Sequence, residues 1–230
     1  MDQSLLFEFI GTAILILLGD GVVANVCLKG TKAYNSGWIV ISIAWGLAVF
    51  VAAFISDPYS GAHLNPALTI GLTLAGKFEG NVIGYIIAQI LGGTVGGCLV
   101  YLFYKPHFDV EEDPNTKLGV FCTIPAIRNY FYNFVSEVIG TFLLVFGILS
   151  VSGSQISGPF PVALLIMAIG MSLGGTTGYA INPARDLGPR LAHAILPIKG
   201  KRDSDWAYSW IPVCGPVCGA LLAALLFNCL

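Results

Sequence analysis

Six apolar stretches, each about as long as a membrane-crossing helix, fill most of this 230-residue chain and constrain its fold more than any other feature. They cover residues 5–28, 38–56, 81–104, 130–152, 161–178 and 206–230, and they contain three acidic residues but no lysine or arginine. A bilayer core about 30 Å thick is crossed by about 20 residues of helix. The sequence therefore predicts an all-α integral membrane protein with six transmembrane helices and no separate soluble domain.

The composition excludes several other classes of protein. Charged residues make up 10% of the chain, against about 25% in soluble domains. A net charge of −2 offers no basic surface for nucleic acid, and six cysteines spread over 230 residues do not make a disulfide scaffold. The first stretch begins at residue 5 without a basic region or a cleavage site, so we expect it to be retained rather than removed as a signal peptide.

Two further segments, 61–76 and 178–197, are expected to be re-entrant or interfacial elements rather than spans. Each contains the triplet Asn-Pro-Ala, as Asn65-Pro66-Ala67 and Asn182-Pro183-Ala184. Asparagine is a good N-cap, proline suits the first helical position, and the residue before proline is held in an extended conformation. The two triplets therefore predict the starts of two half-helices, each preceded by extended backbone.

An internal repeat relates the two halves of the chain. The run Glu8-Phe-Ile-Gly-Thr12 matches Glu137-Val-Ile-Gly-Thr141. In addition, the first short segment follows the second apolar stretch, and the second short segment follows the fifth. We expect a single channel domain over 1–230, with repeats at about 1–104 and 130–230 linked by a loop at 105–129. Because each repeat has an odd number of spans, the second copy is inverted, and such repeats place a site where their half-helices meet. The extended backbone there must be buried or line water, which predicts a pore.

The sequences GAHLNPA at 61–67 and INPARD at 181–186 resemble the two signature loops of the aquaporins, the major intrinsic proteins. The resemblance covers essentially the whole chain. It implies an aquaporin-like bundle of six tilted helices and two half-helices, usually a homotetramer with one pore per subunit. It also implies a multi-pass protein of the plasma membrane with both termini in the cytoplasm, no cofactor, no bound metal and no enzymatic activity.

Single positions in the resemblance favour the glycerol-conducting branch. The positions that correspond to the selectivity filter are Trp45, Gly170, Tyr179 and Arg185, and those that mark the branch are Asp186, Arg190, Pro212 and Val213. Tyr179 is a departure, because the best-known glycerol facilitators have phenylalanine there. The implied permeants are glycerol and water, with urea, dihydroxyacetone and protonated small acids as further candidates.

The chemistry of these residues suits a polyol. Trp45 and Tyr179 can form an apolar corner for the carbon edge of glycerol, while Arg185 offers donors to its hydroxyls. Gly170 is expected to widen the constriction and expose backbone carbonyls. Asn65 and Asn182 are expected to donate to the permeant. The expected carbonyl acceptors belong to Gly61, Ala62, His63, Leu64, Gly178, Tyr179, Ala180 and Ile181. The positive ends of both half-helix dipoles would oppose cations and protons.

Four polar residues in apolar surroundings call for an explanation. Glu8 and Glu137 are expected to accept hydrogen bonds from the backbone of the re-entrant loops, with a functional site or proton relay as the alternative. Asp20 is expected near the aqueous end of its helix, paired with a loop lysine. His63 is expected to order its loop rather than bind a metal, because no second ligand is suitably spaced.

Two questions stay open in the sequence. Of the lysines and arginines in loops, only Lys77 lies on the N-terminal side of the membrane, so the positive-inside rule would put the N-terminus outside, whereas the resemblance puts it inside. Three alternative functions also remain. They are a water-selective aquaporin, against which Gly170 and Asp186 argue, a secondary transporter, and a membrane enzyme, for which no nucleophile–base set is found.

Overall fold

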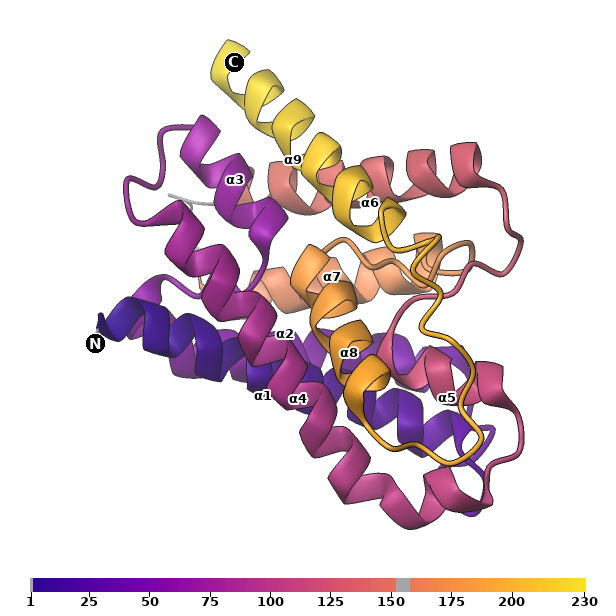
Figure 1. Ribbon diagram of the computed structural model, residues 1–230. Coiled ribbons are helices and arrows are strands. Elements are labelled where there is room, and N and C mark those ends of the chain that lie inside the picture. Colours follow the sequence, from indigo (N-terminus) through magenta and orange to yellow (C-terminus); the bar gives the residue numbers. More distant parts are fainter. Residues whose placement is uncertain (1, 152–157) are drawn as a thin grey trace.

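The computed structural model describes residues 2–151 and 158–230, and within these ranges all regular structure is helical. Five helices are long and apolar enough to cross a membrane: α1 (Gln3–Cys27), α2 (Trp38–Ser60), α4 (Val82–Val110), α6 (Tyr130–Val151) and α9 (Ile211–Cys229). They are tilted against one another in a single bundle (Figure 1). The all-α membrane fold that the apolar stretches predict is confirmed.

The fifth predicted span differs from the structure in its length. Helix α7 (Pro159–Leu173) has 15 residues, whereas the sequence predicted a span that continues to Gly178. A turn follows at residues 174–177, and the Gly178 N–H donates to the Gly174 carbonyl at 2.9 Å. A Cβ at Gly174 would lie 2.5 Å from both the Gly170 carbonyl and the Tyr179 ring, so a larger residue would not permit this turn. The predicted end of the fourth span, Ser152, lies outside the described residues.

The segment predicted as a loop at 105–129 contains helical structure. Helix α4 continues to Val110, and a separate helix, α5, spans Pro114–Phe121. Asp113 caps α5 by accepting from the N–H groups of Asn115 at 3.0 Å and Thr116 at 3.1 Å. Pro114 occupies the first turn, so the local signal that starts α5 is of the same kind as the one predicted for the half-helices.

The two half-helices are α3 (Pro66–Leu74) and α8 (Pro183–Ile195). Each packs against the last long helix of the other half of the chain, α3 against α9 and α8 against α4. Among the other helices, α1 packs on α4 and α2, α6 packs on α9 and α7, and α2 packs on α7 between the two halves of the chain. Close approach of α8 to α4 depends on glycine, because a Cβ at Gly93 would lie 2.7 Å from the Ala184 carbonyl.

Candidate functional site

The asparagines of the two Asn-Pro-Ala triplets cap the half-helices, as the sequence predicts. Asn65 is extended, with φ −157° and ψ 116°, and its Oδ1 accepts from Ala67 N–H at 2.9 Å. Asn182 has nearly the same geometry, and its Oδ1 accepts from Ala184 N–H at 3.0 Å. Pro66 and Pro183 start their helices, and both are buried. The two helix N-termini therefore begin with matched caps.

The same two asparagines also join the two halves of the chain. Asn65 Nδ2 donates to the Ile181 carbonyl at 2.8 Å, and Asn182 Nδ2 donates to the Leu64 carbonyl at 2.9 Å. Each asparagine thus uses one amide N–H within the protein and retains a second one for another acceptor. Both asparagines line the cavity described below, and their hydrogen bonds bring the N-termini of the two half-helices together.

The backbone before each asparagine has an unusual conformation. Ala62, Leu64, Tyr179 and Ile181 all have positive φ values, between 39° and 50°, which residues with a Cβ rarely adopt. In the first loop, Glu8 holds this conformation: its carboxylate accepts from the N–H groups of His63 at 2.9 Å and Leu64 at 2.7 Å. Ser60 and Gln89 donate to the same carboxylate.

Glu137 does the same for the second loop. Its carboxylate accepts from Ala180 N–H at 3.0 Å, from Ile181 N–H at 2.8 Å and from the Thr177 hydroxyl at 2.6 Å. Glu8 and Glu137 are both buried, and neither lines the cavity. Both glutamates thus accept hydrogen bonds from the backbone of the re-entrant loops, the arrangement that the sequence led us to expect.

A cavity of about 490 Å³ runs along both re-entrant loops. Its lining includes Trp45 and Arg185, the two asparagines Asn65 and Asn182, and Lys77, which follows the end of α3 in the chain. Seven of the eight residues whose carbonyls were expected in the pore line this cavity; the exception is Gly178. The seven are Gly61, Ala62, His63, Leu64, Tyr179, Ala180 and Ile181.

His63 lies on the wall of this cavity and is fixed by its neighbours. Its Nδ1 lies 3.1 Å from the Thr69 hydroxyl, and its ring packs edge-on against Phe78 with centroids 4.6 Å apart. Thr69 belongs to α3, so the histidine ties the first re-entrant loop to the half-helix that follows it. This arrangement agrees with the loop-ordering role expected from the sequence.

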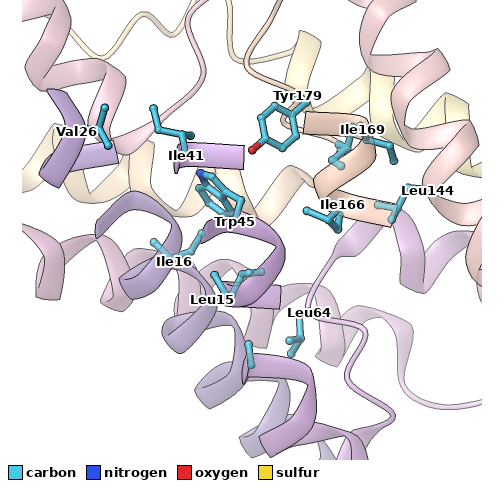
Figure 2. Close-up of a cluster of buried hydrophobic side chains, with 13 residues drawn as sticks. Leu15, Ile16, Val26, Ile41, Trp45, Leu64, Leu144, Ile166, Ile169 and Tyr179 are labelled. Atoms are coloured by element: carbon cyan, nitrogen blue, oxygen red, sulfur yellow. The ribbon is translucent and has the colours of Figure 1, made fainter. Parts of the chain in front are cut away.

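Three of the predicted filter residues, Trp45, Tyr179 and Arg185, line the cavity. The Arg185 guanidinium carbon lies 4.3 Å from the centroid of the Trp45 ring, a cation–π contact. Figure 2 shows the hydroxyl end of Tyr179 pointing toward Trp45 and Ile41. Trp45, Tyr179 and Arg185 are each at least 93% buried, and all three line the cavity. This part of the cavity wall thus places two aromatic rings beside a guanidinium.

Gly170 does not widen the cavity or expose its carbonyl there, although the sequence led us to expect both. It does not line the cavity, and the space beside it is filled by the Tyr179 ring, since a Cβ at Gly170 would lie 2.9 Å from Tyr179 Cζ. Its carbonyl accepts a hydrogen bond from Trp38 Nε1 at 2.9 Å. The absent side chain therefore makes room for the tyrosine ring rather than for a permeant, and the carbonyl is already paired.

The expectation for Asp20 is wrong. Its partner is not a loop lysine but Arg185, whose Nη1 lies 3.3 Å from Asp20 Oδ1. Asp20 is fully buried, because α1 packs directly on the aromatic wall: a Cβ at Gly19 would lie 2.3 Å from the Trp45 ring. Two residues 165 positions apart in the chain thus form one buried ion pair behind the cavity.

The branch-marking residues lie outside the cavity. Asp186 and Arg190 form a fully buried ion pair on one face of α8, with Arg190 Nε 2.8 Å from Asp186 Oδ1. Arg190 also donates to the carbonyls of Ser204 at 2.7 Å and Asp205 at 3.1 Å. Asp186 accepts from the backbone and the hydroxyl of Thr123. This network ties α8 to two loops, and the part played by Thr123 had no signal in the sequence.

The other two branch-marking residues belong to the start of α9. Pro212 is buried in the first turn of the helix, a position that proline suits, and Val213 is half-buried beside it. Neither residue lines the cavity. Their contribution is therefore to the helix that covers α3, not to the wall of the pore.

Comparison with known proteins identifies relatives over the full length of the chain. Residues 1–227 match the family described as Major intrinsic protein. A protein from Thermotoga maritima named "Probable glycerol uptake facilitator protein" is 57% identical, with 98% of each chain covered. "Glycerol uptake facilitator protein 3" of Lactiplantibacillus plantarum is 58% identical over 99% of this chain and 96% of its own length.

A solved structure gives the same result for the fold. The aquaglyceroporin from Plasmodium falciparum superimposes with a TM-score of 0.86 at 33% sequence identity, and the match covers 98% of this chain and 95% of that one. The capped half-helices, the loops held by glutamates and the cavity between them thus occur in a chain whose whole length matches one family. The chain belongs to the major intrinsic protein family.

Proposed function

We propose that this protein is a passive membrane channel that conducts glycerol, other small neutral solutes and water, and excludes ions and protons. The observation that carries the proposal is the group formed by Trp45, Tyr179 and Arg185, which places two aromatic rings beside a guanidinium on the wall of the cavity. The names of its relatives support glycerol as the permeant. No bond is made or broken in such a channel, so its residues need only replace the hydration shell of the solute.

At Trp45, Tyr179 and Arg185, the two edges of glycerol would be recognised separately. The carbon edge would lie against the rings of Trp45 and Tyr179, which we assign as the apolar wall of the selectivity filter. The hydroxyl edge would accept hydrogen bonds from the guanidinium of Arg185. Gly170 belongs to this filter as a spacer, since it allows the Tyr179 ring to occupy its position.

Deeper in the cavity, the solute would move between donors and acceptors without leaving hydroxyls unpaired. The donors are the second amide N–H groups of Asn65 and Asn182, and the acceptors are carbonyls of the two re-entrant loops. Two of these carbonyls, those of Leu64 and Ile181, already accept from the asparagines and have one lone pair left. A ladder of this kind lowers the cost of dehydration for water and polyols alike.

Ions would meet an unfavourable field at the same place. The N-termini of α3 and α8 meet at Asn65 and Asn182, so the positive ends of both helix dipoles face the centre of the pore. A cation or proton there would lose its hydration and face like charge. The proposed filter has glycine at position 170 and tyrosine at position 179, so it contains no histidine side chain. This composition disfavours the alternative of a water-selective aquaporin.

The setting of the channel follows the family. The apolar helices and the family match make it a multi-pass membrane protein. We propose the plasma membrane, both termini in the cytoplasm, a homotetramer with one pore per subunit, and one domain with repeats at 1–104 and 130–230. An epitope inserted after Glu112, whose side chain is 88% exposed, tests the orientation. Antibody should bind it on intact cells, and protection from antibody would reverse the assignment.

Transport is tested in vesicles that contain the purified full-length protein. Stopped-flow light scattering after an osmotic step should show fast shrinkage with an impermeant solute and fast reswelling with glycerol. Urea, dihydroxyacetone and, at acid pH, small carboxylic acids extend the series. Arg185→Val should let protons or small ions leak, because it removes the cationic side of the filter. Fast water flux without glycerol flux would favour the water-selective alternative, and saturable ion-coupled uptake would favour a transporter.

A further inference from the structure

The buried pair of Asp20 and Arg185 is unusual because an acidic group lies directly behind the cationic side of the pore. Arg185 Nη1 lies 3.3 Å from Asp20 Oδ1, and the side chains are 9% and 0% exposed. The ring of Trp45 lies against α1 at Gly19, the residue before Asp20, and the guanidinium of Arg185 stacks on the same ring at 4.3 Å. Asp20, Trp45 and Arg185 therefore form one packed unit.

The other acidic group near Arg185 is already neutralised. Asp186 is paired with Arg190 in a fully buried ion pair on α8. The charged groups that interact with Asp20 within the described ranges are Arg185 and Asp186. The two arginines and the two aspartates sum to zero, so this end of the pore has no net charge. Without Asp20 it would carry one positive charge.

Hydrogen bonding alone does not account for Asp20. Its second oxygen, Oδ2, is buried and finds no hydrogen-bond partner among residues 2–151 and 158–230. An unpaired oxygen on a buried carboxylate costs free energy, unless interaction of the carboxylate with an opposite charge offsets this cost. Asp20 also does not line the cavity, so it does not touch the permeant. Any effect on transport must therefore act through Arg185.

We propose that Asp20 is a specificity-determining positioning residue, which balances the charge of the filter arginine and holds its guanidinium against Trp45. Arg185 then presents hydrogen-bond donors to neutral hydroxyls without acting as a binding site for small anions. The proposal rests on the assignment of Arg185 to the filter. It adds a second charge to the determinants of selectivity, and this charge comes from the opposite half of the chain.

The first test removes the charge and keeps the hydrogen bond. In Asp20→Asn the amide oxygen can still accept from Arg185, but the filter gains one net positive charge. Glycerol flux in vesicles should then become sensitive to nitrate, a small anion that stays ionised at neutral pH. We expect the half-inhibitory nitrate concentration to fall about tenfold or more, with gluconate at equal ionic strength as the reference. Glu111→Gln removes a carboxylate outside the filter and is the matched control.

The second test inverts the charge and does not depend on glycerol. Arg185→Gln leaves Asp20 as an uncompensated negative charge, so vesicles should leak potassium. The double variant Asp20→Asn with Arg185→Gln is neutral again and should leak potassium at least about fivefold less than the single variant. Removing both charges also leaves no unpaired buried ion, so this variant stays informative if Asp20→Asn alone fails to fold.

The outcomes separate this proposal from the proposed function. A double variant that leaks as much potassium as Arg185→Gln would overturn the charge-balancing role. If Asp20 had only a structural role, its replacement would increase the potassium leak further. Nitrate inhibition that is unchanged in a folded Asp20→Asn protein would do the same. Absence of glycerol flux in the parent protein would instead refute the proposed function, while the potassium series would still report on Asp20.

Discussion

Replacing Glu137 with alanine should destabilise the protein by an amount that the hydrogen bonds of the second loop determine. The carboxylate accepts from Ala180 N–H, Ile181 N–H and the Thr177 hydroxyl. Hydrogen bonds to charged groups contribute about 1.5–3 kcal/mol each, so three of them set an upper range of about 4.5–9 kcal/mol. Ala180 and Ile181 line the cavity, where water can reach their freed N–H groups, and we therefore expect about 3–5 kcal/mol.

A graded series makes this expectation sharper. Glu137→Gln retains one carbonyl oxygen as an acceptor and should fall between the parent and Glu137→Ala. Thr177→Val removes one donor and leaves both backbone bonds, so it should cost about 1 kcal/mol. Ser150→Ala deletes an exposed hydroxyl that bonds to the Phe146 carbonyl of the same helix and should have no measurable effect.

The measurement is the half-life of monodisperse protein in detergent at a fixed raised temperature, because unfolding of a membrane protein is commonly irreversible. If about 3 kcal/mol is lost from the unfolding barrier, the half-life of Glu137→Ala should shorten about 100-fold. Glycerol flux of any surviving protein should also fall, since Tyr179 lies within the released loop. A half-life of Glu137→Ala within about twofold of the parent, with Ser150→Ala unchanged, would refute the reasoning.

Three further predictions concern other parts of the molecule. Gly170→Ala should displace the Tyr179 ring, because the new Cβ would lie 2.9 Å from its Cζ, and stopped-flow traces should show glycerol flux falling more than water flux; an equal fall in both would contradict this. Arg190→Met strands the buried Asp186 carboxylate and should cost about 3–5 kcal/mol, seen as lost yield or a shortened half-life, whereas normal yield and half-life would show that the network is dispensable. At Glu111, burial raises the pKa, but N–H groups of residues 113, 112 and 29 outweigh it and hold the pKa below its usual value. Its contribution to stability is therefore full above the ordinary glutamate pKa and is lost as pH falls through the lower folded pKa. Glu111→Gln should flatten this part of the half-life profile below about pH 4.5, and an unchanged acid profile would count against it.

The sequence predicts most reliably the features that depend on neighbouring residues. In the dipeptides Asn65-Pro66 and Asn182-Pro183, the asparagine is both the extended residue and the N-cap, and the proline occupies the first turn. The start of each half-helix therefore follows from local chemistry. Asp113-Pro114 carries the same kind of signal and does start a helix, α5, although the segment was expected to be a loop. Unlike the two Asn-Pro sites, Asp113-Pro114 has no counterpart in the internal repeat.

Features that depend on packing between distant residues could not be predicted in this way. The role of Glu8 and Glu137 was accessible only because the repeat places them at matched positions. Asp20 has no such counterpart, and its pairing with Arg185 depends on how α1 packs against Trp45. The sequence predicts a gap beside Gly170, whereas the Tyr179 ring fills this space. A glycine in the sequence does not indicate which neighbouring side chain occupies the space beside it.

The hydrogen bonds that stabilise the two re-entrant loops also fix the groups that we propose determine solute selectivity. Leu64 and Ile181 have positive φ values, which cost free energy in residues with a Cβ, and a glutamate binds the N–H of each. The carbonyls of Leu64 and Ile181 accept hydrogen bonds from the asparagine of the other half of the chain, so these two bonds form only when both loops are held in place. A change that loosens one loop must therefore shift the acceptor that fixes the asparagine of the other. We conclude that the pore geometry is set by the pair of loops together, and that stability and solute selectivity should fail together when either glutamate is lost.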